Sequence, residues 1–225
     1  MKRHFTILTA ITMLLAFSSC GPTVQDYSEN LRGTWQRDVE KVEDGFVEQG
    51  TLYLSFDSIE PGDDRGGVST IYTGRLDGSD NSSFSADFFI EVFGIYTIDP
   101  EDKEYPLQME WDINSLTVNI ENVKIEDIQT DLQSMMNDVV STLLFGRGDA
   151  KASIAAELKK NIARECRNEL RSRNDDPGWY GLTFSKSDEP DYIIISGSNF
   201  NYRFDYSHSS NLVTEIEVDD VSRIN

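Results

Sequence analysis

The amino-acid sequence predicts a mainly β protein, an antiparallel meander that forms a barrel or a sandwich, with a helical hairpin inserted between late strands. From residue 33 onward, apolar and polar residues alternate in short segments, which is the period of half-buried strands. Between about 125 and 173 the apolar spacing changes to three and four, the period of one helix face. Strand-like alternation then returns. Short connections rich in turn residues favour antiparallel neighbours over a parallel sheet.

The first twenty residues have the pattern of a targeting segment. Lys2, Arg3 and His4 give a positive start, and a mostly apolar run follows over residues 5–17. That run is shorter than the ~20 residues that a helix needs to span a bilayer, and it suits the core of a signal peptide. We therefore expect residues 1–19 to be a signal peptide.

Small residues stand directly before a cysteine in Ser18-Ser19-Cys20-Gly21. This order resembles the lipobox of bacterial lipoproteins, with Phe17 where that family usually has Leu. The resemblance implies that Cys20 becomes the first mature residue and carries a diacylglycerol and an acyl chain such as palmitate. Several chains on one residue anchor a protein stably, so we expect a lipoprotein of the cell envelope, on either face of the outer membrane. The alternative is an ordinary secretory signal cleaved near Ser19.

Residues 20–30 are expected to be the lipidated cysteine and a tether, because Gly21 to Asn30 has no apolar period. A single domain over residues 31–225 then opens with Leu31-Arg32-Gly33-Thr34-Trp35. A Gly-x-Trp at the head of the first strand resembles the opening of the lipocalin-like barrels. By that resemblance, Gly33 allows a tight turn into the strand and Trp35 plugs the closed end of the barrel.

Period-two alternation marks about ten strand candidates. After the strand that opens at Gly33, they are centred on residues 52–56, 68–76, 84–95, 107–111, 116–120, 180–184, 192–195, 200–206 and 212–218. In the candidate over 84–95, apolar residues occupy both faces, so we expect both faces to be covered. Gly94 in the same segment indicates a bulge or a bend.

Two amphipathic helices are expected between about 125 and 173. The first has its apolar face over residues 125–143, and the glycines of residues 146–148 interrupt the pattern. Asp149 is suited to cap the second helix, whose apolar face lies over residues 154–170. This hairpin either forms a lid over a barrel mouth or packs on an outer sheet face.

The composition excludes several chemistries. His208 and Cys166 are the only histidine and cysteine beyond Cys20, so zinc, iron or copper sites and nucleophilic triads built from these residue types are not expected. The net charge of −20 makes nucleic acid an unfavourable partner. We therefore expect no enzymatic activity, no metal and no cofactor.

A short motif lies at the end of the second strand candidate. Asp57-Ser58-Ile59 resembles the Asp-Ser/Thr-apolar acceptor of a general protein O-glycosylation system in some Gram-negative bacteria. The resemblance makes Ser58 a candidate glycosylation site.

Two functions from different classes follow from this sequence. The first is a membrane-anchored, lipocalin-like lipoprotein that binds a small apolar or glycan-derived ligand without catalysis, through residues that the sequence does not identify. The second is an accessory interaction module of a cell-envelope complex, with a filled barrel and another envelope protein as its partner. An open cavity favours the first, and an exposed apolar patch favours the second. A third hypothesis is a hydrolase with two catalytic carboxylates, which would have to share a cleft.

Overall fold

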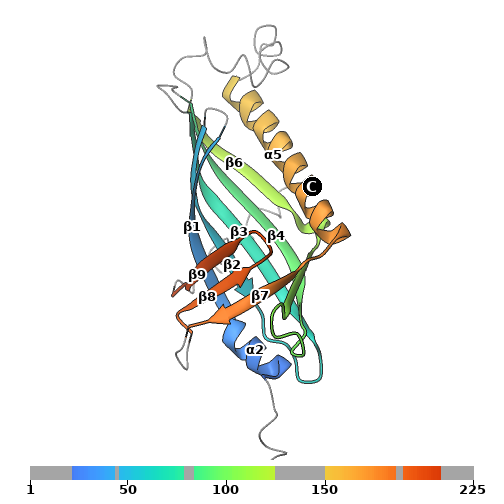
Figure 1. Cartoon of the computed structure of the whole chain (residues 1–225). Helices are drawn as coiled ribbons and strands as arrows, with labels where there is room; N and C mark the ends of the chain where they lie inside the picture. Colours follow the sequence, from blue (N-terminus) through green and yellow to red (C-terminus); the bar gives the residue numbers. More distant parts are fainter. Residues whose placement is uncertain (1–21, 44–45, 79–83, 125–149, 186–189, 209–225) are drawn as a thin grey trace, which may run out of the picture.

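The computed structural model describes residues 22–43, 46–78, 84–124, 150–185 and 190–208 of the chain. It confirms the mainly β fold with a helix inserted between late strands (Figure 1). The strands are β1 (Gly33–Glu43), β2 (Phe46–Phe56), β3 (Arg65–Gly78), β4 (Ser85–Ile98), β5 (Leu107–Trp111), β6 (Thr117–Lys124), β7 (Trp179–Phe184), β8 (Tyr192–Ser196) and β9 (Asn201–Tyr206). The helices are α2 (Val24–Leu31), α5 (Ala150–Asp175) and the 3₁₀ turn η1 (Ile113–Ser115).

Eight of the strands close into an antiparallel barrel. Around the ring they pair in the order β3, β2, β1, β9, β8, β7, β5 and β4, and β4 returns to pair with β3. The β1–β2 and β2–β3 pairs run along the full length of β1 and β2. In contrast, β1 pairs with β9 through Trp35 and Gln36, and β5 pairs with β7 through Leu107 and Gln108. The barrel is therefore closed at one end and opens into a longer curved sheet at the other.

Strand β4 accounts for this opening. One of its edges pairs with β3, and the other pairs first with β6 over residues 85–91 and then with β5 over residues 94–98. Gly94 lies where the partner changes, and it keeps regular register with Val68, so a bulge at Gly94 is wrong. A Cβ at Gly94 would collide with the backbone oxygen of Glu110, which accounts for the glycine.

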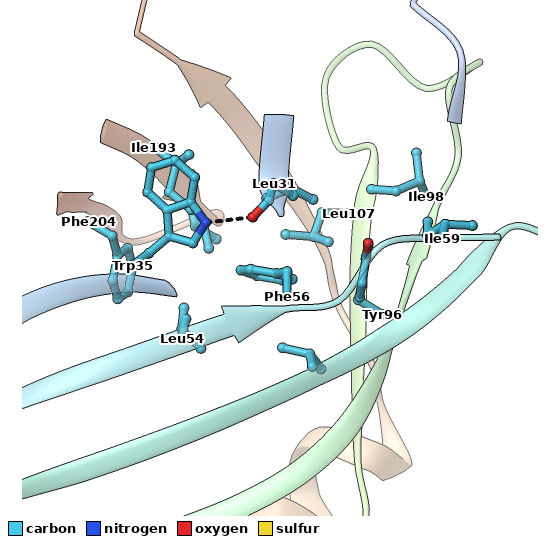
Figure 2. Packing of buried hydrophobic residues seen from close by; sticks show 12 residues of the cluster. Leu31, Trp35, Leu54, Phe56, Ile59, Tyr96, Ile98, Leu107, Ile193 and Phe204 are labelled. Atoms are coloured by element: carbon cyan, nitrogen blue, oxygen red, sulfur yellow. Dashed lines mark hydrogen bonds between the residues drawn. The ribbon is translucent and has the colours of Figure 1, made fainter. Parts of the chain in front are cut away.

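The closed end of the barrel is filled by side chains from several strands (Figure 2). Trp35 of β1 is 1 % exposed, and Tyr96, Leu107 and Ile193 are fully buried beside it. Burial of large apolar side chains is the dominant favourable contribution to folding. The closed end is therefore the hydrophobic core of the domain.

Helix α2 lies across this closed end (Figure 1), so the expected tether over residues 20–30 is wrong from Val24 onward. The helix begins with a capping box. The backbone N–H of Thr23 donates to a carboxylate oxygen of Asp26 at 2.7 Å, and the N–H of Asp26 donates to the Thr23 hydroxyl at 3.3 Å. Such a box satisfies two of the N–H groups that lack partners at a helix start.

Packing holds α2 against the barrel. Leu31 is fully buried in the core, and the ring of Tyr27 lies 6.2 Å from that of Phe184 in β7. The hydroxyl of Ser28 accepts a hydrogen bond from the backbone N–H of Ile59 at 2.7 Å. These contacts tie the helix to β7 and to the connection between β2 and β3.

Helix α5 is the second helix of the expected hairpin, and the first, over residues 125–143, lies outside the described residues. Ile154 of α5 is fully buried against Phe84 and Ala86. Ala86 is in register with Leu76, on the same side of the sheet as the core residues of β3 and β4. Helix α5 therefore covers the inner face of the open sheet, and packing on the outer face is wrong for this helix.

The outer face of β4 differs from expectation. Phe93 is 47 % exposed and Ile95 is 38 % exposed, so the prediction that both faces are covered is wrong. Both side chains alternate with the buried ones along β4, so they lie on its outer face. Within the described ranges, neither α-helix combines the length and the apolar character that a bilayer-crossing helix requires. The strand candidate over 212–218 lies outside these ranges.

Candidate functional site: a cavity at the open end of the barrel

The candidate site is a cavity of about 810 Å³ between the inner face of the open sheet and helix α5. The sheet contributes the apolar side chains of Tyr72, Leu76, Phe88, Ile90 and Val92. The helix contributes Ile162, Cys166 and Leu170, which lie one turn apart along a single face. Small-molecule sites commonly enclose ~300–1,000 Å³ with a mostly apolar lining and few polar groups.

Two glycines lie beneath aromatic rings that line this cavity. Gly50 and Gly74 are directly opposite each other in β2 and β3. A Cβ at Gly50 would lie 3.0 Å from the ring of Tyr72, and a Cβ at Gly74 would lie 2.9 Å from the ring of Phe88. The two rings therefore lie across the glycines, with centroids 4.9 Å apart. The role of these glycines was not predicted from the sequence, although isolated glycines in alternating strands are a recognised sign of close approach.

A hydrogen-bonded pair supplies the inner polar group of the cavity. The hydroxyl of Tyr72 donates to Oε1 of Glu48 at 2.5 Å. Burial raises the pKa of Tyr72 far above its usual value, and the hydrogen bond and negative charge of Glu48 raise it further. The hydroxyl therefore stays protonated near neutral pH and remains a donor to Glu48.

The wall formed by α5 contains a thiol and a rim of charges. Burial raises the pKa of Cys166, and the charges of Glu165 and, to a smaller extent, Glu48 raise it too. Glu48 of β2 and Glu165 and Cys166 of α5 all line the cavity. At the rim, Nη2 of Arg173 lies 2.9 Å from Oε1 of Glu169, so these two charges are paired.

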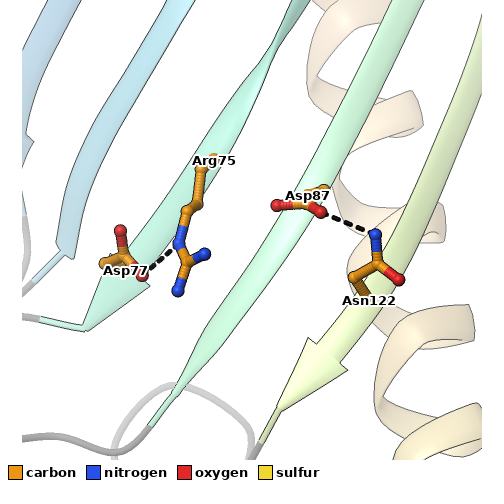
Figure 3. A network of polar contacts seen from close by, with 4 residues as sticks. All are labelled: Arg75, Asp77, Asp87 and Asn122. Atoms are coloured by element: carbon orange, nitrogen blue, oxygen red, sulfur yellow. Dashed lines mark hydrogen bonds and ion pairs between the residues drawn. The ribbon is translucent and has the colours of Figure 1, made fainter.

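The outer face of the same strands is polar (Figure 3). Arg75 and Asp87 are register partners on β3 and β4. Nε of Arg75 lies 2.7 Å from Oδ1 of Asp77, and the side-chain amide of Asn122 donates to Asp87 at 2.7 Å. These four polar side chains therefore lie on the face of the sheet opposite the cavity.

Comparisons with protein-family models, with curated proteins and with solved structures found no match. What the cavity can bind therefore follows from its own geometry and charges. It offers an apolar floor, an apolar helix face and one half-buried carboxylate. Across the described parts of the chain, no group of three or more His, Cys, Asp and Glu side chains is placed to hold a metal ion.

Gly33, Trp35, Ser58 and His208, which were singled out from the sequence, are not among the residues that line the cavity. Gly33 and Trp35 are at the closed end, and Gly33 has the positive φ of 120° that favours glycine. His208 contacts the ring of Tyr206 at a centroid distance of 5.4 Å. Ser58 is exposed in the connection after β2, and Cys20 lies outside the described residues. Of the residues singled out, Cys166 is the one that the structure places in the cavity.

A second hollow of about 560 Å³ lies on the outer face near the closed end. Its floor holds the hydroxyls of Thr34, Ser55 and Ser69 from three adjacent strands. The hydroxyl oxygens of Thr34 and Ser55 are 2.9 Å apart. The exposed ring of Phe93 lies at its side, next to Ile95 on the same strand face.

Proposed function

We propose that this protein is a membrane-anchored, lipocalin-like lipoprotein that binds a small apolar or glycan-derived ligand without catalysis. The observation that carries the proposal is the cavity between the open sheet and α5, whose volume and apolar lining suit a small molecule. The core at the closed end supports it as well, because the fold is stabilised there and the cavity does not have to be filled for the domain to fold. The lining favours an apolar ligand over a purely polar one.

The proposed anchor would orient the cavity. Cys20 precedes the first residue of the capping box, Thr23, by three positions, and an extended chain spans at most ~3.6 Å per residue. With Cys20 lipidated, the closed end and α2 would lie within ~15 Å of the lipid surface. The open end lies at the other end of the molecule (Figure 1) and would face away from the membrane. The cavity would then take its ligand from the aqueous side.

The absence of catalysis is part of the proposal. The described lining contains no histidine, and Cys166 is a protonated, half-buried thiol, which is a weak nucleophile. A glycosidase-like hydrolase requires two carboxyl groups that share a cleft in distinct, tuned environments. Among the described carboxylates of the lining, Glu48 is half-buried while Glu165 and Glu169 are exposed. This arrangement favours binding over hydrolysis.

A cavity-filling variant tests the binding proposal. The full chain carrying Cys20→Ala would be titrated with Nile red, an uncharged apolar dye, and its mass would be measured under native conditions for a copurified ligand. Cys166→Trp places an indole in the cavity, whereas Arg167→Trp places the same group at an exposed position outside the lining. We expect saturable dye binding in the parent and in Arg167→Trp, and a loss of at least tenfold in affinity in Cys166→Trp.

Two results would contradict binding in this cavity. One is the absence of saturable dye binding to the folded parent. The other is equal affinity in Cys166→Trp and Arg167→Trp. A copurified molecule that leaves on activation from the parent, but is missing from Cys166→Trp, would identify the natural ligand class directly.

The exposed apolar residues on β4 favour the second candidate function, an interaction module of a cell-envelope complex. Phe93 and Ile95 form a patch beside the outer hollow, and such patches on a soluble surface commonly mark interaction sites. Mild crosslinking followed by copurification tests this candidate. A crosslinked envelope protein that is lost in Phe93→Ser and retained in Phe89→Ser would support it, and equal recovery would contradict it.

A further inference from the structure

The charged side chains around the cavity differ in their burial. Glu48 is half-buried, whereas Lys41, Glu165, Glu169 and Arg173 are exposed. A charge that is partly withdrawn from water interacts more strongly with a ligand than a charge at the surface. The innermost charge that a ligand meets in the described lining is therefore negative.

Glu48 has acceptor capacity left for a ligand. A carboxylate offers about four lone-pair positions, and Tyr72 occupies one of them. Tyr72 is a donor to Glu48, so it does not compete with a ligand cation for this carboxylate. A ligand group with N–H donors and a positive charge would satisfy Glu48, whereas a second carboxylate or a phosphate would be repelled by it.

Aromatic rings stand beside this carboxylate. Tyr72, which binds Glu48, has its ring 4.9 Å from the ring of Phe88, and both rings line the cavity. The faces of aromatic rings attract ammonium groups within about 6 Å. A carboxylate together with adjacent aromatic faces is an arrangement that recognises an ammonium group.

The remaining charges do not reverse this preference. Arg173 is paired with Glu169 at the rim. Lys41 is in register with Glu48 across the β1–β2 pair, but its side chain is exposed. Glu165 adds a further carboxylate from the α5 side. The described lining therefore contains three carboxylates and two cations, so its net charge is negative.

We infer that the cavity selects an apolar molecule with an ammonium head group, held by Glu48 and the rings of Tyr72 and Phe88. The inference rests on the proposed function, because it concerns the same cavity. It names the head group, which that proposal leaves open. The apolar part of such a ligand would lie against Ile90, Val92 and the inner face of α5.

A set of probes that differ only in their head group tests this inference. Dodecylamine, dodecanol and dodecanoate, each below its micellar concentration, would be used to displace Nile red from the full chain carrying Cys20→Ala. We expect dodecylamine to bind about tenfold more tightly than dodecanoate, with dodecanol between them. Glu48→Gln should reduce the difference between amine and carboxylate to about twofold. 

The matched control separates a local effect from the overall acidity of the protein. Glu40→Gln makes the same charge change in β1, at an exposed position whose neighbours in register are on the outer face. We expect it to leave the preference for dodecylamine unchanged. An equal loss in Glu40→Gln and Glu48→Gln would overturn the inference, since the preference would then come from the net charge of −20.

The failure of the inference and the failure of the proposed function have different signatures. If dodecanoate displaces Nile red as well as dodecylamine does, the cavity binds apolar ligands but Glu48 does not select the head group. If Nile red itself does not bind saturably, the proposed function fails and the inference fails with it.

Discussion

The indole N–H of Trp35 donates a hydrogen bond to the backbone oxygen of Leu31, with 2.7 Å between the nitrogen and the oxygen (Figure 2). Both residues are almost fully buried, at 1 % and 0 % exposure. Leu31 is the last residue of α2, and the last carbonyl groups of a helix have no partner within it. The bond therefore satisfies the buried carbonyl of Leu31 and joins helix α2 to strand β1.

Replacing Trp35 by Phe should destabilise the protein by about 2 kcal/mol, because the buried carbonyl of Leu31 loses its donor. The free energy of unfolding can be measured by urea denaturation of the full chain carrying Cys20→Ala. Trp179→Phe is the matched control, since Trp179 is 40 % exposed and should cost less than ~0.5 kcal/mol. Equal losses in the two variants would show that the bond to Leu31 does not contribute.

Gly33→Ala should destabilise the protein more than Gly62→Ala. Both glycines have positive φ, 120° and 98°, so a Cβ strains the backbone at each, by about 1 kcal/mol or more. Only at Gly33 would the Cβ also meet a side chain, at 2.8 Å from the ring of Tyr206, whereas nothing lies within 4 Å at Gly62. Urea denaturation of the two variants measures the difference. A smaller effect at Gly33 would mean that Tyr206 moves aside without cost.

The contribution of Asp26 to stability should depend on pH. The hydrogen bonds from the backbone and hydroxyl of Thr23 hold the pKa of Asp26 below its usual value. The unfolded chain therefore takes up this proton at a higher pH than the folded chain, and the contribution is present above the unfolded pKa and lost as the pH falls. We expect Asp26→Ala to lower the urea midpoint at pH 7 and to have a smaller effect at pH 3. 

Asp63→Ala provides the comparison for that experiment, because Asp63 is exposed and has no part in the capping box. Its effect should be small at both pH values. A loss in Asp26→Ala that is the same at pH 7 and pH 3 would contradict a role for the ionised carboxylate.

Cys166 should react slowly with iodoacetamide at neutral pH, because its raised pKa leaves little thiolate and its side chain is half-buried. The rate can be followed by mass in the full chain carrying Cys20→Ala, where Cys166 is the remaining thiol. A cysteine at the adjacent exposed position, in Arg167→Cys with Cys166→Ala, should react at least about tenfold faster. Similar rates would show that the thiol is accessible.

Cys20→Ala should release the protein from the membrane fraction of an expressing cell. We propose, from the lipobox-like order around Cys20, that acyl chains on this residue would be the anchor, and each buried CH₂ would contribute about 0.8 kcal/mol. Fractionation followed by detection of the chain measures the distribution. A variant that stays in the membrane fraction would contradict lipidation at Cys20 as the anchor.

The sequence predicted the β fold well because strand periodicity is a local signal. The alternation over residues 107–111 and 192–195, for example, is visible without knowledge of any neighbour. The helix over 150–175 was predicted for the same reason.

Helix α2 was not predicted, although its sequence carries two helix signals. Thr23 and Asp26 have the spacing of a capping box. Val24, Tyr27 and Leu31 recur at the three- and four-residue spacing of one helix face, and they pack against the core.

The ligand-binding hypothesis required an open cavity, but its position and its lining residues were not predicted, because they depend on the path of β4. Pairing with β5 at one end and with β6 at the other depends on long-range register, which no local pattern encodes. That Gly50 and Gly74 lie directly opposite each other is known only once β2 and β3 are aligned. Tyr72 and Phe88 look like ordinary core aromatics in the sequence, and their place beside Glu48 appears only in three dimensions.

The separation between the filled end and the open end also bears on how this chain can change over generations. Strand β4, for example, places Tyr96 in the core and Phe88 and Ile90, several residues along, in the cavity. Distant, independent sites contribute to stability almost additively. Substitutions in the cavity therefore add their own effect on the free energy of unfolding and leave the contribution of the core nearly unchanged. If the cavity binds a ligand as we propose, its specificity can change through such substitutions while the packing of the closed end is kept.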